Sequence, residues 1–177
     1  MKNNKGAIDI SWSILVALVI SLVIMFGIPL YITAQKHDNS IELSAKSATD
    51  EFVSKVAVQG KLTQQDVDNY QLTLDSTGYH WDFEITIQKL DENSAKKVVT
   101  KSKDGKVYIV LYDTQVKDAL STNGEVLLNP GDQITIEGKN VTTTYSDDLS
   151  SATLGTSSKN VGAMSVKSSA MVTGQGN

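Results

Sequence analysis

Between Ile10 and Gln35 the chain reads ISWSILVALVISLVIMFGIPLYITAQ, without one charged side chain. A helix of about 26 residues at ~1.5 Å per residue is roughly 39 Å long, which exceeds the ~30 Å hydrocarbon layer of a bilayer. The part from Ile14 to Phe26 is apolar on every helical face, whereas a soluble amphipathic helix keeps a polar stripe. Trp12 and Tyr31 lie near opposite ends, where aromatic side chains anchor at membrane interfaces. The sequence therefore predicts one transmembrane helix, over residues 7–35.

The charges around this helix predict its orientation. Lys2 and Lys5 precede it in a short basic leader, residues 1–6, so the positive-inside rule keeps the N-terminus in the cytoplasm. We therefore expect a single-pass membrane protein with membrane lipid as its first partner and an extracytoplasmic C-terminal domain. A cleaved signal peptide ending at Ala34 is the alternative, but the apolar run is longer than the usual signal core of about 7–15 residues.

The same helix is predicted to continue beyond the membrane as an amphipathic segment, residues 36–60. Its apolar residues recur at helical spacing, and Gly60 is a suitable stop just after them. Gly27 and Pro29 lie inside the long helix and predict a kink near the outer interface. The residues of the predicted apolar face are Ile41, Ala45, Ala48, Phe52 and Val56.

Residues 61–172 are predicted to form an extracytoplasmic α+β domain. A short helix follows the Thr63 cap, with Asp66 in its first turn and Gly78 closing it. The period then changes to two in a half-buried strand that carries Trp81, Phe83, Ile85 and Ile87. Further strands are expected at 106–112, 125–128, 133–137 and 161–172, with 141–145 as an extension of the sheet, 146–160 as a surface loop and 173–177 as a flexible tail.

The expected fold class is thus α+β: a long N-terminal helix, half transmembrane and half amphipathic, packed on a small, mainly antiparallel β-sheet with one short extra helix. Asn129-Pro130-Gly131-Asp132 supplies a turn between two of the strands.

Composition excludes several kinds of chemistry. The chain has no cysteine, so disulfides, thiolate metal sites and cysteine nucleophiles are impossible. All 16 basic residues are lysine and the net charge is −4, so we expect no nucleic-acid partner. His80, Asp82 and Glu84 share one strand face, and such a trio can chelate a metal, but the polar face of any amphipathic strand produces the same pattern. With no catalytic motif, we expect no enzyme activity, cofactor, metal or small-molecule substrate.

The residues before the apolar helix, Lys5-Gly6-Ala7-Ile8-Asp9, resemble the class III signal of type IV pilin-like proteins. The resemblance implies that a prepilin peptidase cuts between Gly6 and Ala7 and leaves the helix on the mature protein. It makes Asp9 the candidate assembly contact, an acid that pairs with the α-amine of a neighbouring subunit. The family usually has glutamate at the fifth mature position, where this chain has Ser11.

A second resemblance concerns the layout from Ala48 to Ile87: a helix, then Gly60-Lys61-Leu62-Thr63, a short helix, and Thr77-Gly78 before a strand. With Gly131-Asp132 later, this layout is similar to the minor pilin-like proteins (TadE-like pseudopilins) of tight-adherence pilus systems. It implies a non-enzymatic structural subunit in pilus assembly and cell adhesion, with other pilin-like subunits as partners and a place in a cell-surface pilus. The alternative is a signal-anchored extracytoplasmic binding module of a surface, secretion or conjugation apparatus.

Overall fold

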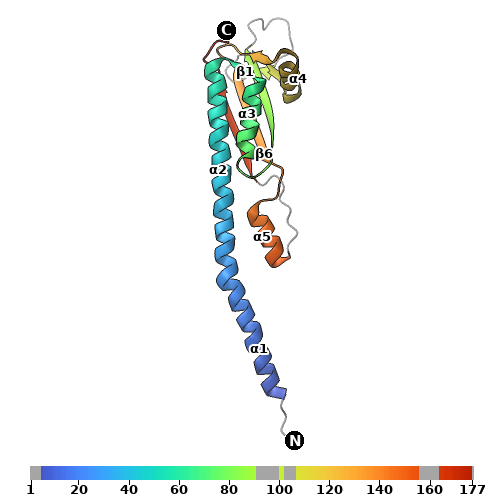
Figure 1. Cartoon of the computed structure of the whole chain (residues 1–177). Helices are drawn as coiled ribbons and strands as arrows, with labels where there is room; N and C mark the ends of the chain where they lie inside the picture. Colours follow the sequence, from blue (N-terminus) through green and yellow to red (C-terminus); the bar gives the residue numbers. More distant parts are fainter. Residues whose placement is uncertain (1–4, 91–99, 102–106, 156–163, 177) are drawn as a thin grey trace. The chain divides into compact units, whose positions relative to one another are not determined.

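The computed structural model has the predicted α+β fold, in which a long N-terminal helix packs on antiparallel sheets with additional short helices (Figure 1). It describes residues 5–90, 100–101, 107–155 and 164–176. The chain divides into two compact units. Residues 1–39 and 144–159 form unit 1, and residues 40–143 and 160–177 form unit 2.

The long helix consists of three consecutive parts. Helix α1 covers Lys5–Leu22, a π-helical turn η1 covers Val23–Gly27, and α2 covers Ile28–Gln59. The helix ends where the sequence predicts, because Gly60 adopts the left-handed conformation (φ +67°) that glycine tolerates best. The predicted helical stretch up to Gln59 is therefore confirmed.

Unit 2 contains two antiparallel sheets. The larger has the strand order β3-β4-β2-β6-β7, and the smaller pairs β1 with β5. Central strand β2 pairs with β4 on one side and with β6 on the other. The strands are β1 (Lys61–Thr63), β2 (Trp81–Leu90), β3 (Thr100–Lys101), β4 (Val107–Leu111), β5 (Glu125–Leu127), β6 (Gln133–Asn140) and β7 (Ser165–Met171).

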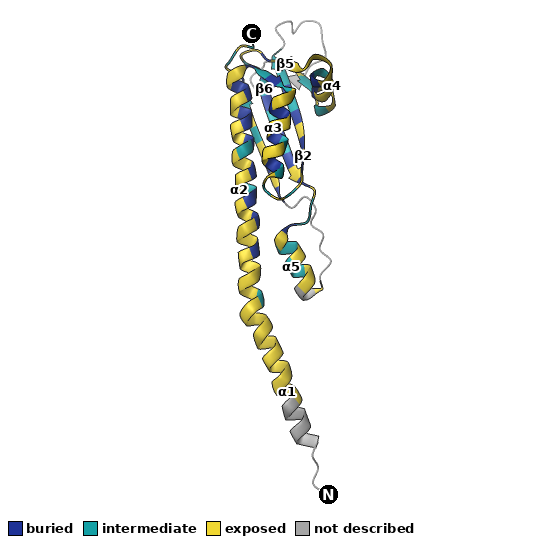
Figure 2. Ribbon diagram, viewed as in Figure 1, coloured by how far each residue is buried: buried dark blue, intermediate teal, exposed yellow. Residues whose placement is uncertain are grey.

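The hydrophobic core of unit 2 lies between its helices and one face of the larger sheet (Figure 2). The predicted apolar face of α2 contributes to it, with Ala48 partly buried and the other four residues buried. The predicted strand positions of β2 are buried as well, and Trp81 exposes only 1% of its surface. Phe52 stacks on Tyr70 at 4.5 Å between ring centroids, which joins α2 to helix α3 (Gln64–Asp75).

The predicted short helix is α3, Gln64–Asp75. The Thr63 hydroxyl accepts a hydrogen bond from the Asp66 amide at 3.2 Å, and the Asp66 carboxylate accepts one from the Thr63 amide at 3.3 Å. This reciprocal capping satisfies two amides at the helix start. The helix ends at Asp75, three residues before the predicted stop, and Gly78 (φ +91°) lies in the turn that follows.

Two sequence predictions are corrected here, and one helix was not predicted. Residues 141–145 do not extend the sheet, because β6 ends at Asn140. The predicted loop 146–160 contains helix α5, Tyr145–Leu154, whose first turn is capped by Thr144. A further helix, α4 at Asp113–Asn123, was not predicted; it buries Val116 and Leu120 and ends at Gly124 (φ +75°).

The C-terminal residues 173–176, predicted as a flexible tail, make close backbone contacts with α2. The amides of Thr173 and Gly174 both donate to the Ala57 carbonyl at 3.0 Å. A side chain at Gly174 would overlap the carbonyl oxygen of Val58. The tail is therefore bonded to the last turn of α2, where it supplies donors for a carbonyl that the helix cannot satisfy itself.

Candidate functional site

The candidate functional site is the apolar surface of the first helix. From Trp12 to Ile32 the large apolar side chains expose between 39% and 67% of their surface (Figure 2). By length and composition this is the one helix, among the described residues, that is able to cross a membrane. The exposed side chains are Trp12, Ile14, Leu15, Val16, Leu18, Val19, Ile20, Leu22, Val23, Ile24, Met25, Phe26, Ile28, Leu30, Tyr31 and Ile32.

An apolar surface of this size is unfavourable in water. Burying one such side chain is worth about 2 kcal/mol, so the whole set is worth on the order of 30 kcal/mol. Monomeric soluble proteins rarely expose contiguous apolar patches of more than a few hundred Å². The surface therefore requires an apolar partner, either lipid or other helices.

The predicted kink coincides with a change of helix type. The α-helix gives way to π-helix at Val23–Gly27, directly before Pro29. Proline has no amide hydrogen, so the Met25 carbonyl, four residues earlier, loses its α-helical donor, and a π-helical turn accommodates that loss. The Thr33 hydroxyl donates to the Pro29 carbonyl at 2.8 Å. The altered hydrogen bonding lies at the predicted residues; the bend of the axis stays a prediction.

The residues that carry the pilin resemblance lie at the start of the helix. The backbone of Gly6, Ala7 and Asp9 belongs to α1. Their side chains lie outside the part of the chain that the structure describes. The cleavage site and the assembly role of Asp9 therefore stay predictions.

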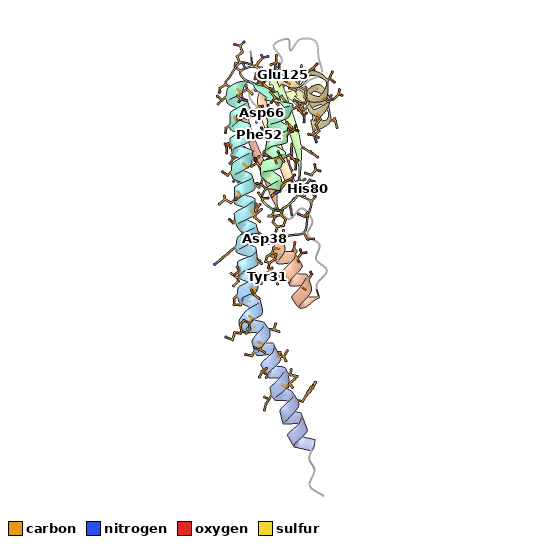
Figure 3. All side chains as sticks on the ribbon, viewed as in Figure 1. Tyr31, Asp38, Phe52, Asp66, His80 and Glu125 are labelled. Atoms are coloured by element: carbon orange, nitrogen blue, oxygen red, sulfur yellow. The ribbon has the colours of Figure 1, made fainter. Side chains whose placement is uncertain are left out.

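Unit 1 also contains a contact that sequence reasoning missed. Asp38, on α2, is buried (6% exposed) and accepts hydrogen bonds from the Tyr145 amide at 3.2 Å and the Ser146 amide at 2.9 Å (Figure 3). These are the first two amides of α5. The Thr144 hydroxyl accepts from the next, Asp147, at 3.2 Å.

The contact places a carboxylate at the positive end of the α5 dipole, which is favourable. The His37 ring lies edge-on to Tyr145, 6.0 Å between centroids. The pattern Thr144-x-x-Asp147 is a sequence signal for the start of a helix such as α5. Gly155 (φ +65°) is a signal for its end. Nothing in the local sequence links either residue to Asp38.

Of the suggested metal trio, His80 has another partner. The His80 ring lies 3.1 Å from the Asp75 carboxylate, and Trp81 begins the strand one residue later. Within the described ranges, no three histidine or acidic side chains gather closely enough to hold a metal ion.

The polar face of the larger sheet carries an ion-pair cluster instead. Lys167 contacts Glu137 at 3.0 Å, and Lys139 contacts it at 3.6 Å. The hydrogen bond and charge of Lys167, with the charge of Lys139, hold the pKa of the Glu137 carboxyl below its usual value. Since all three side chains are solvent-exposed, the cluster contributes little to stability.

Comparison of this chain with protein-family models, with curated proteins and with solved structures finds no match. The functional argument therefore rests on the sequence and on the geometry described above.

Proposed function

We propose that the chain is a non-enzymatic, pilin-like structural subunit that its first helix holds in a membrane. One observation carries the proposal. The helix is continuous from Lys5 to Gln59, yet from Trp12 to Ile32 it exposes apolar side chains on every face, while its second half packs into a folded unit. A soluble domain gains nothing from such an unburied half, whereas an assembling membrane subunit needs it.

The helix surface suits two successive environments. Lipid tails solvate it before assembly, and the helices of other pilin-like subunits take the place of lipid in a fibre. Inside such a fibre an unpaired charge is costly, so an acidic group near the helix start requires a partner. In this proposal the partner of Asp9 is the α-amine of a neighbouring subunit, which cleavage after Gly6 creates.

The proposed role is that of a minor pilin in a tight-adherence or type IV-like pilus. The major subunits of tight-adherence pili are usually much shorter than this chain. A folded unit of this size after residue 40 therefore favours the minor role. Lys2 and Lys5 favour a cytoplasmic N-terminus, which supports an extracytoplasmic location of that unit in this proposal.

The proposal is tested by the N-terminus of the membrane-extracted protein, made in cells that contain a prepilin peptidase. We expect a mature chain that begins at Ala7. Gly6→Leu should abolish the cut, because the peptidase recognises glycine before the cleaved bond. The matched control is Gly27→Ala, a glycine substitution in the same long helix, where the nearest atom to the added carbon is Val23 Cγ1 at 3.8 Å.

A chain that keeps Met1 would contradict the proposal and favour the signal-anchored binding module. A chain that begins at Gln35 would contradict both, because the apolar helix would then be absent from the mature protein.

A further inference from the structure

The position of α5 in unit 1 sets a limit on how far the helix can enter a membrane. Asp38 and Thr144 together accept from the first three amides of α5, and the fourth, at Asp148, donates to the Thr144 carbonyl at 3.0 Å. The bond from Asp148 is the first hydrogen bond within the helix, so every amide from Tyr145 to Asp148 has an acceptor. Helix α5 is firmly held against α2 at this end.

From this fixed end α5 runs back alongside the apolar part of the long helix. In Figure 3 Asp38 lies beside its first turn and Tyr31 further along it. Ala34, between these two residues, is only 1% exposed, although the residues around it on α2 are exposed. Since α5 has 10 residues, it is about 15 Å long and reaches the level of about Ile28 on α2.

The composition of α5 is incompatible with hydrocarbon. Its sequence, YSDDLSSATL, has two aspartates in the first turn, and Asp148 and Ser151 are solvent-exposed. A charged side chain at the bilayer centre costs about 2.5 kcal/mol or more. The two aspartates therefore keep hydrocarbon away from the first turn of α5, beside Asp38. At the far end, the carbonyls of the last turn have no donor within the helix and are costly in hydrocarbon, so the hydrocarbon layer must end before that end, near Ile28.

We propose that α5 rests on the surface of the lipid bilayer and stops the helix there, so that the membrane-embedded part ends at the π-helical turn. The span is then Ile10 to Gly27, about 18 residues or ~27 Å, which is close to the ~30 Å of one hydrocarbon layer and leaves Asp9 outside it. Pro29 lies at the lipid surface, and Leu30 and Ile32 lie among headgroups rather than acyl chains. The span is shorter than the sequence alone predicts.

Aromatic placement agrees with this depth. Tyr31 on α2 exposes 39% of its surface and lies four residues, or ~6 Å, beyond Gly27, in the stretch assigned to headgroups. Tyrosine favours this region because its ring is apolar and its hydroxyl is polar. The inference rests on the membrane placement in the proposed function, but not on cleavage or pilus assembly.

The test measures depth with spin labels on single cysteines, which the cysteine-free chain allows. Full-length Leu22→Cys, Leu30→Cys and Ser151→Cys are labelled in phosphatidylcholine vesicles. For each, the collision rate with oxygen, which favours lipid, is divided by that with a water-soluble nickel chelate. We expect a high ratio at Leu22 and ratios several-fold lower at Leu30 and Ser151. A ratio at Leu30 or Ser151 equal to that at Leu22 would overturn the proposal.

A second variant tests whether α5 sets the depth. Adding Asp38→Ala to Leu30→Cys removes the acceptor for α5, so the label should move toward the Leu22 ratio. Asp50→Ala, an exposed aspartate of the same helix, is the matched control and should change nothing. An unchanged label in Asp38→Ala would overturn the proposal. Equal nickel access at all three labels would instead show that the chain is outside the bilayer, and would contradict the membrane placement itself.

Discussion

Gly60 and Gly124 are both left-handed glycines that follow helices, with φ of +67° and +75°, but their surroundings differ. A Cβ added at Gly60 would lie 2.5 Å from the Gly176 nitrogen and 2.7 Å from the Gly174 oxygen. A Cβ added at Gly124 would meet nothing within 4 Å. The pair therefore separates the cost of backbone conformation from the cost of crowding.

We predict that Gly124→Ala lowers the free energy of unfolding by about 1 kcal/mol, the cost of a left-handed alanine. Gly60→Ala should cost about 2 kcal/mol more, because the docked tail must also move. Urea unfolding of the full chain in detergent micelles measures both. Equal losses would show that the tail is not packed on the end of α2.

Asp66 is predicted to make stability depend on acid pH. Burial raises the pKa of its carboxyl, but the hydrogen bonds from Lys55 and Thr63 and the charge of Lys55 outweigh burial, so the pKa lies below its usual value. The Lys55 nitrogen lies 2.7 Å from the carboxylate. A lowered pKa means that the stabilisation is complete above the unfolded-state value and is lost as the pH falls through the folded-state value.

Asp66→Asn should therefore cost about 1 kcal/mol at neutral pH, and the difference from the unchanged chain should shrink as the pH falls below 3.8. Asp68→Asn, an exposed aspartate of the same helix, is the control and should change stability by less than about 0.5 kcal/mol. Unfolding curves across pH 2.5 to 7 make the comparison. A constant difference at every pH would contradict the assigned role of the ionised carboxylate.

Among the elements, the turn at residues 129–132 connects strands of two different sheets rather than two neighbouring strands of one sheet. The strands on either side of it, β5 and β6, pair with β1 and with β2 and β7 respectively. Asp132, 1% exposed, holds this junction: its carboxylate accepts from the Leu90 amide at 2.8 Å and from the Asn129 amide at 2.9 Å.

Asp132→Ala leaves those two amides without their acceptor. We predict a loss of about 3 kcal/mol in the free energy of unfolding. Asp118→Ala, on the exposed face of α4, should cost less than about 0.5 kcal/mol. Thermal unfolding of both variants, followed by near-ultraviolet circular dichroism, decides between a structural junction and an ordinary surface loop.

The elements that sequence could predict are those whose signals are local. The spacing of Ile41, Ala45, Phe52 and Val56 predicted the buried face of α2, and Thr63 with Asp66 predicted the start of α3. Alternation at period two predicted β2. Each of these signals depends on residues a few positions apart, which share one helix face, one cap or one strand face.

The elements that were missed depend on distant partners. Helix α5 lies within a segment rich in serine, threonine, glycine and aspartate, a composition typical of a loop, and Asp38 holds its first turn across more than 100 positions of sequence. Similarly, Asp113 at the start of α4 accepts from the Ile85 amide at 3.0 Å. Periodicity cannot detect such contacts, so the candidate site was predicted as a bare helix without its companion α5.

For the whole molecule, the folded unit and the apolar helix have separate roles. The apolar core of unit 2 is buried by residues of the chain itself, including the apolar face of α2, and the tail is hydrogen-bonded to the end of α2. The surface from Trp12 to Ile32 is not, and it requires lipid or other helices. In the proposed function the long helix therefore links a folded domain with a buried core to an exposed apolar surface that is buried only on assembly.

The intact mass of this chain in surface fibres sheared from intact cells tests that proposal. The account predicts a chain in the fibre fraction that begins at Ala7 and still carries the apolar helix. Recovery of the chain in the membrane fraction alone, with Met1 retained, would contradict it.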